Sequence, residues 1–146
     1  MWSIAGQELT GTYGNWNDRV YEVIVDRGPE IGLLLSAEAA PADGWLRRLQ
    51  DDFWGEDMRW ELRVPSDEVS GIRSVLVETP ICGKVFTVQA QRDDGFWALT
   101  RAGALDRILA ARLGLTEAGG TWSGWVSDDE IVDFIRTPAA GAPSPV

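Results

Sequence analysis

The sequence predicts an α+β fold: a single domain with a mainly antiparallel sheet of about five to six strands and about three helices covering one face. Several short segments alternate between apolar and polar residues and follow one another through hairpin-length turns, which favours antiparallel neighbours. Three other segments place apolar residues at spacings of three and four, as amphipathic helices do. The length of 146 residues, with 45% hydrophobic and 25% charged residues, suits one globular domain.

The first strands are expected to form a hairpin. Apolar and acidic residues alternate along residues 20–27 (VYEVIVDR), which predicts a half-buried strand. A turn at Gly28-Pro29 follows, and residues 30–36 (EIGLLLS) are the expected partner strand. A further strand near residues 4–12 is left open.

The first helix is expected after this hairpin. Pro41 suits the first turn of a helix. The apolar residues that follow recur at helical spacing and would share one face. They are Trp45, Leu46, Leu49 and Phe53.

The central strands have the clearest alternation. Residues 58–64 (MRWELRV) place apolar side chains on one face, and Arg59, Glu61 and Arg63 on a face that we expect to meet water. Residues 72–79 and 84–91 are expected to pair around a turn at residues 80–83. After a turn at Asp93-Asp94-Gly95, residues 96–99 predict a short returning strand.

Two helices are predicted near the C-terminus. Thr100 is a candidate N-cap and Gly114 a candidate C-terminal residue. The core positions of that helix would be Leu105, Ile108, Leu109 and Leu113. Ser127 and Glu130 form a capping box that predicts a last helix ending before Pro138. Its inward residues would be Ile131, Val132, Phe134 and Ile135. Residues 1–136 are expected to be the single domain, and the Pro- and Ala-rich residues 137–146 a disordered tail.

Composition excludes several function classes. The chain has no histidine, which removes the commonest general base and most zinc sites. The net charge of −10 argues against binding to nucleic-acid phosphates. With no basic and apolar leader and no long apolar run, we expect a cytoplasmic protein without membrane contact. The lone Cys82 lacks a histidine partner and is expected to be a small buried or half-buried residue.

Acidic residues and tryptophans are the candidates for a binding surface. One acidic cluster surrounds Trp54 at the end of the first predicted helix, and another starts the last one. Carboxylates early in a helix favour its dipole, whereas carboxylates near its end cost stability. Tryptophan is frequent at binding hot spots, although the loop tryptophans could also be lids over the core. The candidate partner-binding residues are Asp51, Asp52, Trp54, Glu56, Asp57, Trp122, Trp125, Asp128 and Asp129. Catalytic residues, bound metal and cofactors are not expected.

In size, acidity, tryptophan content and expected α+β order, the chain resembles the small immunity proteins encoded beside polymorphic toxins in actinobacteria and proteobacteria. That resemblance implies a cytoplasmic, non-enzymatic protein that binds and inhibits a cognate bacterial toxin. Negative charge would speed association with a basic active-site cleft.

Three alternatives remain at this stage. The chain could be a ligand- or partner-binding regulatory module without catalytic activity. It could be an enzyme that uses converging carboxylates, with or without a divalent metal. It could mimic DNA, although arginines interspersed among the acidic residues would break a continuous acidic strip.

Overall fold

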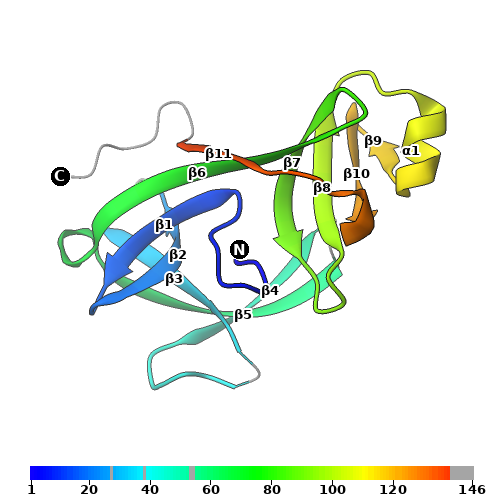
Figure 1. Cartoon of the computed structure of the whole chain (residues 1–146). Coiled ribbons are helices and arrows are strands. Elements are labelled where there is room, and N and C mark those ends of the chain that lie inside the picture. Colours follow the sequence, from blue (N-terminus) through cyan, green and yellow to red (C-terminus); the bar gives the residue numbers. More distant parts are fainter. Residues whose placement is uncertain (27, 38, 53–54, 139–146) are drawn as a thin grey trace. The chain divides into compact units, whose positions relative to one another are not determined.

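The computed structural model describes residues 1–26, 28–37, 39–52 and 55–138, with backbone only for 49–52, 55–58 and 138. Within these residues the chain forms eleven strands and one α-helix, linked mainly by antiparallel pairing (Figure 1). The predicted α+β fold with five to six strands and three helices is therefore wrong. The protein is mostly sheet, because two of the three predicted helices are strands or turns.

The chain divides into two compact units. We call Thr12–Ser74 the hairpin unit, and Met1–Gly11 with Val75–Ala139 the helix unit. In the hairpin unit the strands follow the order β4-β5-β3-β2-β1, and β1 is followed by β6, of which only residues 70–74 belong to this unit. Their bounds are β1 Gly11–Trp16, β2 Arg19–Val25, β3 Glu30–Ser36, β4 Leu46–Asp52, β5 Gly55–Pro65 and β6 Ser70–Ile81, with a 3-10 turn η1 at Ser66–Glu68.

The predicted strands of the hairpin unit are confirmed. β2 and β3 pair as the expected hairpin, and β3 then pairs with β5, which contains the whole alternating segment 58–64. One face of this sheet forms an apolar core. Its buried residues are Tyr21, Val23, Ile31, Leu33, Val64 and Val69.

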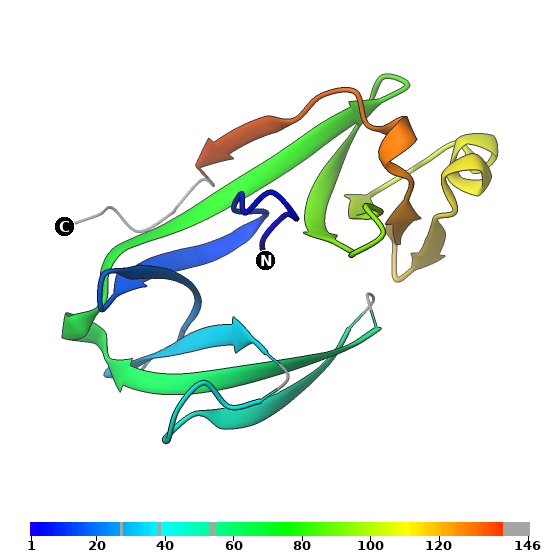
Figure 2. The ribbon, with the colours of Figure 1, turned by 60° about the horizontal axis from the view of Figure 1, so that its bottom comes forward.

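In the helix unit the order continues as β6-β7-β8-β10-β9, with β11 on β6. The bounds are β7 Lys84–Gln91, β8 Trp97–Ala102, α1 Arg107–Leu113, β9 Thr116–Ala118, β10 Thr121–Val126 and β11 Ile135–Pro138. Figure 2 shows α1 close to β9 and β10. The expected pairing of β6 with β7 is confirmed, and its turn is the two residues Cys82 and Gly83.

The core of the helix unit lies between this sheet and α1. Leu109 and Leu113 of α1 are buried among residues of β7 and β8, such as Phe86 and Leu99. Gly124 of β10 permits the approach, since a Cβ there would lie 2.6 Å from the backbone oxygen of Gly114.

The first predicted helix is instead β4. All seven residues of β4 have cross-strand partners in β5, from Leu46 opposite Glu61 to Asp52 opposite Gly55. Leu46 is 71% exposed, so it is not part of a buried helical face. As the terminal strand of its unit, β4 has no need of the alternating apolar pattern that reveals an internal strand.

The second predicted helix starts later than its candidate cap. Thr100 lies within β8, and the N-cap of α1 is Asp106, whose side chain accepts a hydrogen bond from the Ile108 backbone N–H. Gly114 does end the helix, in the left-handed conformation. Ile108, expected in the core, is 81% exposed.

The last predicted helix is a single 3-10 turn, η2, at Asp128–Glu130. Ser127 caps it as expected by accepting from the Asp129 backbone N–H, but the chain is extended from Ile131. Residues 135–138 pair as β11 with β6. Of the residues predicted to point inward, Ile131 packs against the core of the helix unit, whereas Val132 is 89% exposed. Of the predicted tail 137–146, Thr137 and Pro138 end β11, and residues 139–146 lie outside the described part.

The expectation that Cys82 is buried or half-buried, which its apolar neighbours suggested, is also wrong. It is exposed, at the first position of the two-residue turn between β6 and β7. Its φ of 50° and that of Gly83, 77°, are the pair of positive values that such a hairpin turn requires. Among the described residues no helix is long and apolar enough to cross a membrane.

Candidate functional site: the β4–β5 hairpin

The acidic residues predicted around Trp54 lie at one end of a long hairpin formed by β4 and β5 (Figure 2). Asp51 is the cross-strand partner of Glu56, Asp52 that of Gly55, and Asp57 that of Gln50. The four acids, which we call the hairpin acids, are thus brought together by backbone pairing. Trp54 lies outside the described residues.

Directly opposed like charges cost a sheet some stability. Asp51 opposite Glu56 is such a pairing. The strand register thus sets two acids at opposed positions at this end of the hairpin.

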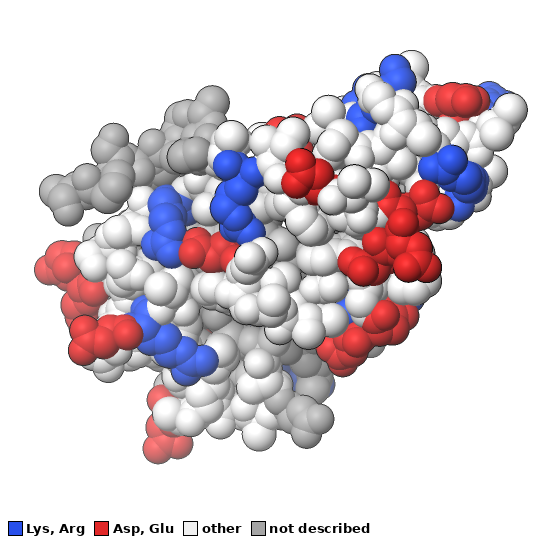
Figure 3. Space-filling view, in the orientation of Figure 1, with Lys and Arg blue, Asp and Glu red and all other residues white. Residues whose placement is uncertain are grey.

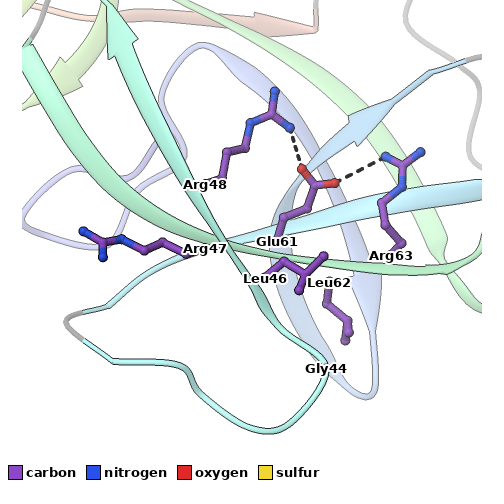
Figure 4. A pocket seen from close by; sticks show the side chains of 7 residues that line it. All are labelled: Gly44, Leu46, Arg47, Arg48, Glu61, Leu62 and Arg63. Carbon is purple, nitrogen blue, oxygen red and sulfur yellow. Dashed lines mark hydrogen bonds and ion pairs between the residues drawn. The ribbon is translucent and has the colours of Figure 1, made fainter.

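The other end of the same hairpin carries three arginines. A groove of about 370 Å³ opens where β4 begins (Figure 4). It exists because β4 starts at Leu46, opposite Glu61, whereas β5 continues to Pro65. Its lining residues are Gly44, Leu46, Arg47, Arg48, Glu61, Leu62 and Arg63.

Glu61 is the centre of an ion-pair network in this groove. Its two carboxylate oxygens lie 2.5 Å from Arg48 Nη1 and 3.5 Å from Arg63 Nη1. Arg63 also donates to both carboxylate oxygens of Asp26, at 3.1 and 2.8 Å, and this raises the pKa of the Arg63 guanidinium. In Figure 4 Arg47 points away from Glu61.

A glycine makes room for these charged groups. A Cβ at Gly32 would lie 3.1 Å from both Arg63 Nη1 and Glu61 Oε2. Further along the same face, Arg59 is only 6% exposed and its guanidinium lies 3.2 Å from the Glu22 carboxylate. The expectation that Arg59 would meet water is therefore wrong, because its side chain is buried beside an acidic partner.

The second predicted cluster is largely bound within the helix unit. Asp128 Oδ1 accepts a hydrogen bond of 2.8 Å from the indole N–H of Trp97, a buried core residue. Glu130 lies 3.1 Å from Arg112 Nη2, and Asp133 Oδ1 accepts from the backbone N–H of Phe134. Asp129 is exposed.

The two predicted tryptophans of β10 are half-buried. Trp122 packs against the core of the helix unit. Trp125 has the guanidinium of Arg92 over its ring, 4.9 Å from the centroid, and the same guanidinium lies 5.1 Å from the Phe96 ring. Trp122, Trp125, Asp128 and Asp129 therefore belong to the helix unit, and the hairpin acids to the hairpin unit.

A second hollow, of about 500 Å³, lies at the β1–β2 turn. Its lining combines Trp16 with polar residues, including Asn17 and Asp18, which both have positive φ in the turn. Among the described residues, no group of three or more His, Cys, Asp or Glu side chains is placed to hold a metal ion.

Sequence reasoning did not select the arginine groove. Arg47, Arg48 and Arg63 were noticed only as charges that interrupt the acidic residues, because the segment around Leu46 was assigned to a helix. The alternation of residues 58–64 was the available signal, since it already placed Glu61 and Arg63 on one face. Searches among protein-family models, curated proteins and solved structures found no match to this chain.

Proposed function

We propose that this chain is a non-enzymatic, cytoplasmic protein of the immunity type, which binds and inhibits a cognate bacterial toxin. The observation that supports this most directly is the gathering of four acidic residues at one end of the β4–β5 hairpin. A concentrated negative charge attracts a basic cleft over several ångströms and raises the association rate. The net charge of −10 adds to that attraction.

The four hairpin acids are the preferred contact residues in this proposal. Trp54 falls between them in the sequence and would be the candidate apolar anchor. Trp122, Trp125, Asp128 and Asp129 rank lower, because Trp122 packs on the core, Trp125 lies under Arg92, and Asp128 is bonded to Trp97.

A DNA mimic is less well supported than a toxin inhibitor. Figure 3 shows basic side chains between acidic ones on the left of the visible face, where a mimic would need a continuous acidic strip. The alternative of a ligand-binding regulatory module draws on one specific observation, the arginine-lined groove of about 370 Å³. An anionic ligand would have to compete there with Glu61 and Asp26, which already pair with Arg48 and Arg63.

The test is co-purification of the chain with the product of its adjacent gene, at low and at moderate salt, followed by an assay of the toxic activity. We expect a stoichiometric complex that silences the activity and associates more slowly as salt rises. A neighbour that does not bind, or that binds and stays active, would contradict the proposal. In that case a thermal-shift screen of small anions would test the groove.

Matched variants locate the surface. One variant neutralises the hairpin acids: Asp51→Asn, Asp52→Asn, Glu56→Gln and Asp57→Asn. The control neutralises four exposed acids elsewhere: Asp43→Asn, Asp67→Asn, Asp93→Asn and Glu117→Gln. Both variants change the net charge equally, so a larger loss of association rate in the first assigns binding to the hairpin. Equal losses would show that only overall charge matters.

A further inference from the structure

β4 is an open edge of the hairpin unit. It stands at the end of the strand order, and among the described residues its only strand partner is β5. An edge strand presents unpaired backbone N–H and C=O groups on its outer side, which can pair with another strand. Leu46, Arg47 and Arg48, at its start, are exposed.

The opposite end of the strand order differs. β9 has three residues, Thr116–Ala118, and short edge strands offer little backbone for pairing. β4 has seven residues, so it offers more than twice as long an edge.

The charges of β4 are divided between its two halves. The strand reads Leu-Arg-Arg-Leu-Gln-Asp-Asp, with Arg47 and Arg48 before Leu49, and Asp51 and Asp52 after it. Charges of one sign along an edge would repel a second copy. A basic half followed by an acidic half has the opposite effect on a second copy that runs antiparallel.

Antiparallel pairing of two β4 strands has one register that matches all seven residues. In it Leu49 faces Leu49, and Arg47 of each copy faces Asp51 of the other. Two-fold symmetry about an axis perpendicular to the sheet requires a residue to face itself, and Leu49 meets that requirement. Arg48 lies diagonal to Asp52 of the other copy, within reach of a long side chain. Parallel pairing would instead oppose arginine to arginine.

We propose that two copies of this chain associate through antiparallel pairing of their β4 strands, centred on Leu49 and held in register by reciprocal Arg47–Asp51 pairs. The combined sheet would run from β5 of one copy through both β4 strands to β5 of the other. Glu56 and Asp57 belong to β5 and lie outside this pairing. Asp51 and Asp52 also belong to the hairpin acids of the proposed function, so dimerisation would compete with toxin binding for these two residues. Dimer formation does not need the toxin-binding function to hold, and it is measured without a toxin.

The test uses the full chain in sedimentation and light-scattering measurements from about 1 μM to about 1 mM. A reducing agent is present because Cys82 is exposed and could link copies covalently. We expect a monomer–dimer equilibrium within this range. Salt screens both the Arg47–Asp51 attraction and the repulsion between two chains of net charge −10, so the charge reversals below, rather than salt, test the pairs. A chain that stays monomeric over this range would overturn the proposal.

Two charge reversals give the decisive comparison. Arg47→Asp places Asp opposite Asp51, and Asp51→Arg places Arg opposite Arg47, twice in each dimer. Each variant alone should raise the dimer dissociation constant about thirtyfold, from two attractive pairs turned repulsive. Mixed together they should form a heterodimer, because every opposed pair is then of opposite sign. The double variant Arg47→Asp/Asp51→Arg should dimerise as the wild type does.

The controls make the same charge changes away from β4. Arg107→Asp and Asp93→Arg alter exposed residues of the helix unit and should leave the dissociation constant unchanged. Circular dichroism establishes that each variant is folded. If the two single reversals dimerise as before, or if mixing them does not restore association, the β4 interface is refuted. Restoration by mixing also cannot come from misfolded chains, so the result is independent of small losses in stability.

Discussion

Two acidic clusters look alike in the sequence and have different places in the structure. The cluster at η2 has internal partners: Asp128 is bonded to Trp97, and Glu130 is paired with Arg112. In the hairpin cluster, backbone pairing sets Asp51 opposite Glu56, another acid. The difference teaches that a run of carboxylates does not by itself mark a binding surface. The η2 acids lie beside partners within their own unit, whereas the strand register of the hairpin sets two acids at directly opposed positions.

The largest expected effect is on the buried ion pair of Arg59 and Glu22 in the hairpin unit. This pair tests how much a charged partner within the fold contributes to the free energy of unfolding. Their side chains are 7% and 19% exposed, and the guanidinium lies 3.2 Å from the carboxylate. Arg59→Ala should lower the free energy of unfolding by about 3 kcal/mol, because it removes a buried cation and leaves a charged carboxylate in a poorly hydrated site. Urea unfolding followed by circular dichroism measures this loss.

A double-mutant cycle separates the charge from the packing. Glu22→Gln in the Arg59→Ala background should cost much less than it does in the wild type, because the cation is already gone. Arg48→Ala is the matched comparison, since Arg48 is 45% exposed and pairs with Glu61. It should change stability by less than about 1 kcal/mol. Equal losses for Arg59→Ala and Arg48→Ala would contradict the role of burial.

The second prediction compares two neighbours within the η2 cluster. Asp128→Ala should lower the free energy of unfolding by about 1–2 kcal/mol, because it leaves the indole N–H of buried Trp97 without its acceptor. Asp129→Ala should change it by less than about 0.5 kcal/mol, since Asp129 is an exposed surface position. Thermal unfolding of both variants checks the difference. If Asp129→Ala lowers the free energy of unfolding as much as Asp128→Ala does, the electrostatic effect of acids at the start of η2, rather than the hydrogen bond to Trp97, explains the loss.

The cap at the start of the η2 cluster could be predicted from the sequence, because it depends only on neighbouring residues. Ser127 and the acids after it form a local capping signal, and the structure keeps the cap, with Ser127 Oγ accepting from the Asp129 backbone N–H. The conformation of the chain beyond this turn depends on a distant strand. β11 pairs with β6, more than fifty residues earlier, and a local pattern holds no information about that partner. The β-branched Ile131, Val132 and Ile135 were the available hint against a helix.

The hairpin acids were selected correctly as a group but were placed on the wrong element. The spacing of Trp45, Leu46 and Leu49 fits a helix by chance, whereas Leu46 is exposed on the edge strand β4. Alternation identified β2 and β5, and the turns beside them identified β3, β6 and β7 as partner strands. Edge strands such as β4 and β9 do not need a buried face and therefore need not alternate. Their pairing can be known only after the central strands are in place.

The third prediction tests the unfavourable pairing in the hairpin and has the opposite sign. Glu56→Gln should raise the free energy of unfolding by about 0.2–1 kcal/mol, because it removes one of two acids at directly opposed positions. Asp57→Asn is the matched control, since its cross-strand partner is the neutral Gln50. Chemical unfolding at low salt measures both, and high salt should reduce the gain. A loss of stability in Glu56→Gln would mean that Glu56 has a favourable partner.

The smallest effect concerns Asp94, an exposed acid whose cation partner, Arg92, is also exposed. Arg92 donates two hydrogen bonds to one carboxylate oxygen of Asp94 and one to the other, and this lowers the pKa of Asp94 below its ordinary value of 3.8. A carboxylate whose folded pKa is lowered stabilises the fold above its unfolded pKa. That contribution is lost as the pH falls through the lower, folded value.

Arg92→Gln should therefore raise the pKa of Asp94 toward its ordinary value, and it should reduce the dependence of stability on pH below about 4. The carboxyl chemical shift of Asp94, followed by NMR from neutral to acid pH, gives its pKa in the wild type and in the Arg92→Gln variant. Asp67→Asn, a distant exposed substitution, should leave the titration of Asp94 unchanged. Because Asp94 is exposed, a shift that depends on Arg92 would show that a nearby partner acts on a carboxylate without burial. If the pKa of Asp94 is the same with and without Arg92, a nearby cation does not by itself lower the pKa of an exposed carboxylate. The difference between the two acidic clusters would then depend on whether the partner of each carboxylate is buried.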